Sequence, residues 1–144
     1  MNDKTLMDVM WVLVASGLVF VMQAGFALLE SGFTRSKNSI NVAMKNMTDL
    51  GFSVILYWAF GFALMFGTSY RGWTGTSGFL FETSSDVWQT TFFLFQAMFC
   101  ATSATIVSGA SAERMRYGSY LLVTLATSGL IYPILGHWIW SEDG

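Results

Sequence analysis

The sequence contains few of the residues that support catalysis or bind metals. Its 144 residues include one cysteine, one histidine and one proline. Cys100 has no second cysteine with which to form a disulfide within the chain. Together with His137 it also falls short of the four ligands that a tetrahedral metal site requires. We therefore expect no metal and no cofactor.

Charged residues are equally scarce. Only 11% of the residues are charged and the formal net charge is −2, whereas 53% are hydrophobic. The seven Lys and Arg residues occur in small, separate groups. Because no basic stripe is available to follow a phosphate backbone, nucleic acid is excluded as a partner. The composition is typical of an integral membrane protein, whose surroundings are membrane lipid.

Sequence signatures of enzymes are missing too. The apolar runs contain no pair of carboxylates and no Ser-His-Asp set, and the glycines are dispersed instead of forming a phosphate-binding loop. The amino terminus does not resemble a signal peptide, because its apolar run from Val9 to Leu29 is longer than a typical signal core. We predict that the protein is not an enzyme and that this run is retained as a membrane span.

Long apolar runs dominate the rest of the chain. We expect one unit, residues 1–144, with four spans at about residues 6–29, 50–67, 88–112 and 117–140. Spans of this length in lipid must be helices, because a helix satisfies its own backbone hydrogen bonds. The fold class is therefore an all-α integral membrane protein. Residues 68–87, rich in Gly, Ser and Thr, are expected to form a solvated external turn.

The basic residues predict an orientation in the membrane. Lys and Arg are enriched in cytoplasmic loops, and five of the seven lie between spans one and two or between spans three and four. We therefore expect both chain ends outside the cell. The five are Arg35, Lys37, Lys45, Arg114 and Arg116; the other side has Lys4 and Arg71 with Asp3, Asp8, Glu82, Asp86, Glu142 and Asp143.

The stretch from Phe92 to Arg116 is the most distinctive in the chain. Phe95 and Phe99 are four residues apart and therefore share one helix face. Small residues continue this face toward the cytoplasm: Ala101, Thr105 and Gly109. Such a helix fits either the border of a vestibule that narrows into the bundle or ordinary close packing. The residues alone leave both interpretations open.

Four other residues in or beside the spans have structural interpretations. Gln23 is expected to hydrogen-bond to another helix. Glu30 lies five residues before Arg35 and is expected at the cytoplasmic interface, paired or solvated. Pro133 removes a backbone hydrogen bond and predicts a kink. His137 is expected to be a hydrogen-bonding residue and not a proton carrier.

Three motifs carry a resemblance to a known family. Read together they are similar to the ammonium transporter family, the Amt, Mep and Rh group, over essentially the whole chain. The extracellular amino terminus also matches the topology of that family. The motifs are QAGFALLESGFTRSKN (residues 23–38), FQAMFCATSATIVSGASAERMR (95–116) and YPILGHWIW (132–140).

The resemblance implies a fold, a substrate and site residues. The family has eleven spans in an inverted repeat, forms homotrimers in the cell membrane and passes ammonium or ammonia. By this resemblance Phe99 and Trp140 bind the cation at an outer recruitment site. Phe95 and Phe99 form the gate above an apolar pore. An aromatic face attracts a cation by about 0.5–2 kcal/mol, far less than complete dehydration of the ion costs, so recruitment and passage are separate steps.

The chain also departs from the family pattern. The two pore histidines of the family lie on later helices, and His137 does not correspond to either. With its end at Gly144 the chain is expected to be truncated and unable to conduct alone.

Two other functions are compatible with a chain of this kind. One is an ammonium-sensing membrane module that reports to a cytoplasmic signalling domain. The other is a four-span proton-coupled drug exporter, for which Glu30 would have to lie in the middle of the membrane. The terminal position of Glu30 and the firm charge bias weigh against the exporter.

Overall fold

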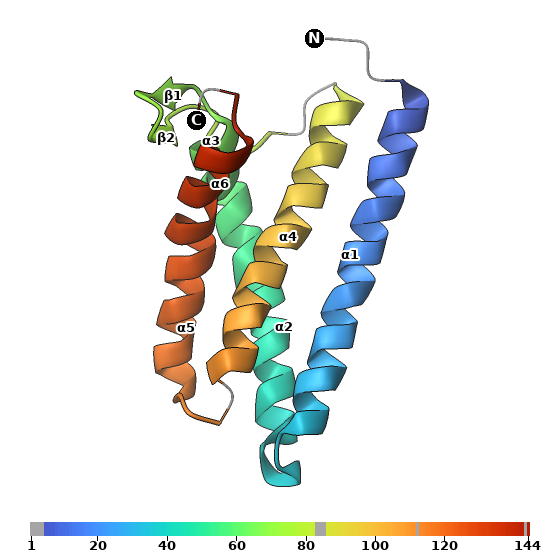
Figure 1. Cartoon of the computed structure of the whole chain (residues 1–144), viewed down its shortest axis with the longest axis vertical. Coiled ribbons are helices and arrows are strands. Elements are labelled where there is room, and N and C mark those ends of the chain that lie inside the picture. Colours follow the sequence, from blue (N-terminus) through green and yellow to red (C-terminus); the bar gives the residue numbers. More distant parts are fainter. Residues whose placement is uncertain (1–4, 83–85, 112, 143) are drawn as a thin grey trace.

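In the computed structural model the chain forms long helices in an up-and-down bundle (Figure 1). The structure describes residues 5–82, 86–111, 113–142 and 144. Within this part, four helical segments are long and apolar enough to cross a membrane, which confirms the all-α membrane fold. The elements are α1 (Leu6–Phe33), η1 (Ser36–Asn38), α2 (Ser39–Leu56), η2 (Tyr57–Gly61), α3 (Phe62–Phe66), β1 (Ser69–Tyr70), β2 (Thr74–Gly75), α4 (Val87–Ser111), α5 (Tyr117–Ala126), η3 (Thr127–Ile131) and α6 (Tyr132–Trp140).

The two ends of the bundle differ. One end carries the β1–β2 hairpin, the start of α1 and the end of α6, and we call it the hairpin end (Figure 1). The other, the turn end, carries the connections α1–α2 and α4–α5. Four predicted positions lie outside the described residues: Ala112, the expected end of the third span, and Asp3, Lys4 and Asp143, which entered the charge argument.

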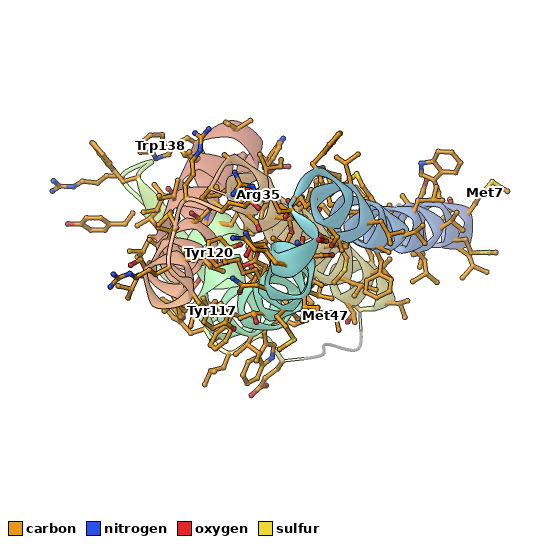
Figure 2. All side chains as sticks on the ribbon, turned by 90° about the horizontal axis from the view of Figure 1, so that it is seen from below. Met7, Arg35, Met47, Tyr117, Tyr120 and Trp138 are labelled. Atoms are coloured by element: carbon orange, nitrogen blue, oxygen red, sulfur yellow. The ribbon has the colours of Figure 1, made fainter. Side chains whose placement is uncertain are left out.

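Helix α1 begins with a capping box and packs along a narrow stripe. The Thr5 hydroxyl accepts the Asp8 N–H at 3.3 Å, and the Asp8 carboxylate accepts the Thr5 N–H at 2.8 Å. The only buried residues of α1 are Ser16, Gln23 and Glu30, spaced seven apart. Figures 1 and 2 show the Met7 end of the helix leaning away from the others. The rest of its apolar surface is left free to face lipid or further protein.

The second helix begins at Ser39, well before the predicted span at Leu50. Its early turns contain Lys45, Asn46 and Asp49, which in sequence resemble a polar loop. All three are buried, with Asp49 completely inaccessible. The expectation that Lys45 lies in a cytoplasmic loop is therefore wrong, because its side chain finds partners inside the bundle.

Two π turns interrupt the helices in the half of the bundle near the hairpin end. In η2 the N–H of Phe62 donates to the carbonyl of Tyr57, and in η3 the N–H of Tyr132 donates to that of Thr127. The turns pack against each other. Pro133, where the sequence predicts a kink, is the second residue of α6 and follows directly after η3. A π turn is a common way to accommodate a missing helical hydrogen bond.

The connection after α3 folds back onto η2. The N–H of Leu80 donates to the carbonyl of Ala59 at 2.8 Å, and the N–H of Phe81 donates to that of Trp58 at 3.1 Å. Both carbonyls belong to η2, so the loop is bound to the π turn through its backbone. Residues 76–80 are exposed, as a solvated external turn predicts, whereas the half-buried Phe81 packs into the bundle.

The loop also contributes to the aromatic core. The ring of Phe81 stacks on Phe93 with centroids 4.3 Å apart and planes inclined by 4°. Phe81 also meets Phe62 edge to face at 4.9 Å. This cluster packs α3 and the loop after it against α4. The buried members of the core are Tyr57, Phe62, Met65, Ala97, Met98 and Cys100.

Candidate functional site

Phe95 and Phe99 form an aromatic pair on α4. Their ring centroids are 4.8 Å apart and their planes are inclined by 67°, the edge-to-face geometry that aromatic pairs favour. Both side chains are half-buried. The spacing of four residues therefore places the rings together as expected, with part of each ring accessible.

Trp140 is the last residue of α6 and is 53% exposed. Its ring pairs with Tyr132 at 6.3 Å. Among the ring contacts between described residues, none joins Trp140 to Phe99. A cleft of about 250 Å³ has both Trp140 and Ser103 in its wall, and Ser103 lies one turn beyond Phe99 on α4. The structure thus pairs Phe95 with Phe99 and places Trp140 against Tyr132.

His137 is completely buried and ties α6 to the hairpin end. Its Nδ1 lies 2.8 Å from the Met65 carbonyl, and its Nε2 lies 2.9 Å from the Ser69 hydroxyl. Because a carbonyl can only accept, Nδ1 carries a proton and donates to Met65, and Nε2 shares a second hydrogen bond with the Ser69 hydroxyl. These contacts confirm that His137 is a hydrogen-bonding residue.

Gln23 joins α1 to α4. Its Nε2 donates to the Thr102 hydroxyl at 2.8 Å, and its Oε1 accepts from the Thr105 hydroxyl at 3.0 Å. The Thr102 hydroxyl in turn donates to the Met98 carbonyl of its own helix, and the single Thr105 proton is shared between Gln23 and the Ala101 carbonyl. The predicted interhelical role of Gln23 is confirmed.

A buried polar cluster near the turn end was not predicted. The Tyr120 hydroxyl and the Thr124 hydroxyl both donate to the Asp49 carboxylate, the latter at 2.8 Å. Lys45 Nζ donates to the Met115 carbonyl at 3.3 Å and lies 4.9 Å from the centre of the Tyr120 ring. Figure 2 shows Tyr120 among the helices and Tyr117 at their edge. The cluster locks α5 to α2.

Glu30 is part of the same polar layer. Its Oε2 accepts from Asn46 Nδ2 at 2.9 Å and from the Ser108 hydroxyl at 3.0 Å. The side chain is 6% exposed. The expectation of a paired or solvated Glu30 at the interface is wrong in this respect: α2 and α4 enclose it, and no ion pair with Arg35 is formed.

A signal for this layer exists in the sequence. Asn46, Asp49 and Ser53 of α2 recur at intervals of three and four, and Lys45 lies four residues before Asp49, so the four share one helix face. A polar stripe of this kind on a largely apolar helix indicates a buried hydrogen-bonding face.

Glu113 connects the two turns at the turn end. Its Oε1 accepts from Asn38 Nδ2 at 2.8 Å and from the Arg35 N–H at 3.1 Å. These hydrogen bonds, the Asn38 amide first, lower the pKa of the Glu113 carboxyl below its usual value. Arg35, Lys37, Arg114 and Arg116 are all exposed at this end.

These features define a multi-pass helical membrane protein with buried polar contacts between its helices. Comparison with known sequences then gives the family. Residues 10–144 match the Ammonium Transporter Family, and the chain belongs to it.

Individual relatives support this assignment. A protein of Synechocystis sp. is 56% identical over 137 residues, covering 95% of this chain and 25% of that protein. Ammonium transporter Amt2 of Archaeoglobus fulgidus is 46% identical over 140 residues, covering 96% of this chain and 30% of that protein.

Solved structures give the same result. The structure of Sensor Amt Protein matches with a TM-score of 0.88 at 38% identity, covering 94% of this chain and 35% of that one. Mep2 of Saccharomyces cerevisiae matches with a TM-score of 0.85 at 24% identity, covering 99% of this chain and 34% of that one, and shows the shared fold. The chain thus spans a quarter to about a third of its relatives, in their N-terminal part.

Proposed function

We propose that the complete protein moves ammonium or ammonia across the cell membrane. The observation that carries this proposal is the family match over residues 10–144. The transported species is the one named in relatives such as Amt2 of Archaeoglobus fulgidus. The apolar helices and the absence of catalytic signatures from the sequence support transport instead of catalysis.

In this proposal Phe99 and Trp140 recruit the cation at the hairpin end. The partly accessible ring of Phe99 and the 53% exposed ring of Trp140 offer aromatic faces to a cation. Such contacts are worth about 0.5–2 kcal/mol each. This is enough to concentrate a dilute cation and too little to compensate for its full dehydration.

Phe95 and Phe99 then act as a gate. Their edge-to-face contact at 4.8 Å forms an apolar barrier beside α4 that a hydrated ion cannot pass without losing water. Neutral ammonia, separated from its proton, crosses an apolar pore at much lower cost.

The orientation follows from the turn end. Its exposed basic residues favour the cytoplasmic side, which puts the amino terminus outside. The largely unburied surface of α1 provides area for lipid and for neighbouring subunits of the homotrimer that the family resemblance implies. The basic residues are Arg35, Lys37, Arg114 and Arg116.

Substitution of Trp140 tests the recruitment site. In the complete protein we expect Trp140→Leu to raise the KM for methylammonium uptake by roughly 2- to 30-fold, the equivalent of one lost cation–π contact. Uptake of radiolabelled methylammonium is measured in cells that lack other ammonium transporters. Trp138→Leu is the matched control, since Trp138 is also on α6 and 46% exposed, and packs on Trp73. An unchanged KM in Trp140→Leu, at normal surface abundance, would contradict the recruitment role.

Ammonium sensing is the second candidate function. It is favoured by the match to Sensor Amt Protein at 38% identity. The gene sequence beyond Gly144 separates the two: a soluble output domain after the last span indicates a sensor. Uptake of methylammonium by the complete protein indicates a transporter.

A further inference from the structure

The carboxylate of Glu30 is only half satisfied. Its Oε2 accepts two hydrogen bonds, from Asn46 and Ser108. Its Oε1 is buried and receives no donor from the described residues, and the same is true of Asn46 Oδ1. Two enclosed oxygen atoms therefore lack hydrogen-bond donors in one place, which is costly in the interior of a membrane protein.

The described neighbours of Glu30 supply no cationic partner to its carboxyl group. In the same polar layer, Tyr120 and Thr124 donate to the Asp49 carboxylate, and Lys45 donates to a backbone carbonyl. A second carboxyl group, that of Glu113, lines the cavity beside Glu30. A buried carboxylate favours a nearby positive charge, and a cation beside Glu30 would supply it.

Space for such a cation lies beside the Glu30 side chain. Glu30 lines a cavity of about 350 Å³ between α1 and α4, whose walls include Phe26, Ile106 and Gly109 and the polar side chains of Thr34 and Glu113. A Cβ at Gly109 would lie only 3.1 Å from Glu30 Oε1. A side chain at this position would therefore crowd the oxygen, which is itself enclosed in this structure.

The donor set selects the kind of cation. Within the described residues no group of three or more His, Cys, Asp or Glu is placed to hold a metal ion. Divalent cations prefer six or more oxygen ligands, and besides Glu30 the side chains that line the cavity offer only the oxygens of Thr34 and Glu113. A cation that brings its own N–H donors fits better, because it can donate a hydrogen bond to the free oxygen of Glu30.

We infer that Glu30, with Asn46 and the space at Gly109, forms a second cation site near the turn end, specific for ammonium or a small alkylammonium ion. The identity of the cation rests on the proposed function, whereas the preference of the buried carboxylate for a nearby positive charge does not. The site lies toward the opposite end of α4 from the Phe95–Phe99 pair and holds ammonium on the cytoplasmic side of the pore.

Glu30→Gln tests the site in the complete protein. The glutamine has nearly the same shape and retains an oxygen for Asn46 and Ser108, while the charge is removed. Ammonium and methylammonium binding is titrated calorimetrically, with sodium chloride as the ionic control, in a Trp140→Leu background that weakens the outer site. We expect Glu30→Gln to lower the affinity at least about tenfold, the loss of a charged hydrogen bond.

Two further variants sharpen the test. Glu82→Gln removes the same charge from an exposed side chain and should leave the affinity unchanged. Gly109→Ala keeps Glu30 but crowds its Oε1 and should also weaken binding, which remains informative if Glu30→Gln folds poorly.

Three results would overturn the inference. The first is an equal ammonium affinity in Glu30→Gln and Glu82→Gln, and the second is equal binding of sodium and ammonium. The third is an infrared carbonyl band that disappears in Glu30→Gln and is unaffected by ammonium, which would mean that Glu30 holds a proton and not the cation. Failure of the proposed function is separate, because it appears as absent methylammonium uptake by the unsubstituted protein whatever the titration shows.

Discussion

Removal of a single hydroxyl should reveal how strongly the buried polar cluster holds the bundle together. Tyr120 is completely buried, and its hydroxyl donates to the Asp49 carboxylate. Tyr120→Phe leaves that carboxylate with the hydroxyl of Thr124 as its remaining side-chain donor. A hydrogen bond to a charged group contributes about 1.5–3 kcal/mol, and we expect a loss of unfolding free energy in this range. The aromatic face toward Lys45 is retained, so the cation–π contact at 4.9 Å should persist.

Tyr117→Phe is the matched control for this prediction. It removes the same atom from the same helix, but the Tyr117 hydroxyl pairs with the exposed, neutral Thr48 at 2.7 Å. Interhelical hydrogen bonds of this kind average about 0.6 kcal/mol in membrane proteins, so the expected loss is small. The assay is denaturant unfolding of the purified complete protein in detergent, followed by tryptophan fluorescence. Equal losses in Tyr120→Phe and Tyr117→Phe would refute the argument that burial and charge make the Asp49 contact strong.

Two further predictions concern the contact between the π turns η2 and η3 and the hydrogen bonds of Glu113 at the turn end. Gly129→Val should lower the unfolding free energy by about 1–3 kcal/mol, because a Cβ there would lie 3.0 Å from the Phe60 ring, whereas Gly118→Val, with open space around it, should be tolerated. The pKa of the Glu113 carboxyl is lower in the folded protein than its ordinary value of 4.5. The stability that the Glu113 carboxylate contributes is therefore fully present above pH 4.5 and is lost as the pH falls through the lowered pKa of the folded state. Limited proteolysis of the turns should therefore accelerate in acid, and Glu113→Gln should lack that pH dependence.

The membrane fold was readable from sequence because hydropathy alone determines it. Four apolar runs of spanning length leave little alternative to helices. The start of α2 was missed, because Lys45 and Asp49 resemble a polar loop when their interior partners are unknown. Those partners, Met115 and Tyr120, come from residues far along the chain. The polar face of α2 is visible in its sequence, but the distant partners that hydrogen-bond to it are not.

The site was predictable only in part. Phe95 and Phe99 lie together because a four-residue interval on a helix guarantees it. The surroundings of Trp140 depend on the rotation of α6, which η3 sets. Pro133 is the only sequence signal near η3, and η2 has no proline at all. The one-residue change in hydrogen bonding that defines each π turn therefore could not be predicted from the sequence.

The paired π turns have a consequence for insertions and deletions. A π turn holds one residue more than the α turn that it replaces, and one residue corresponds to about 100° of helical rotation. Loss of a single residue from η3 would allow a regular helix, yet it would swing His137 away from the Met65 carbonyl and turn Trp140 toward a different neighbour. The number of residues in η3, as well as their identity, therefore determines which way the side chains of α6 face. Length changes of one residue should be tolerated in the turns between helices and not within η2 or η3.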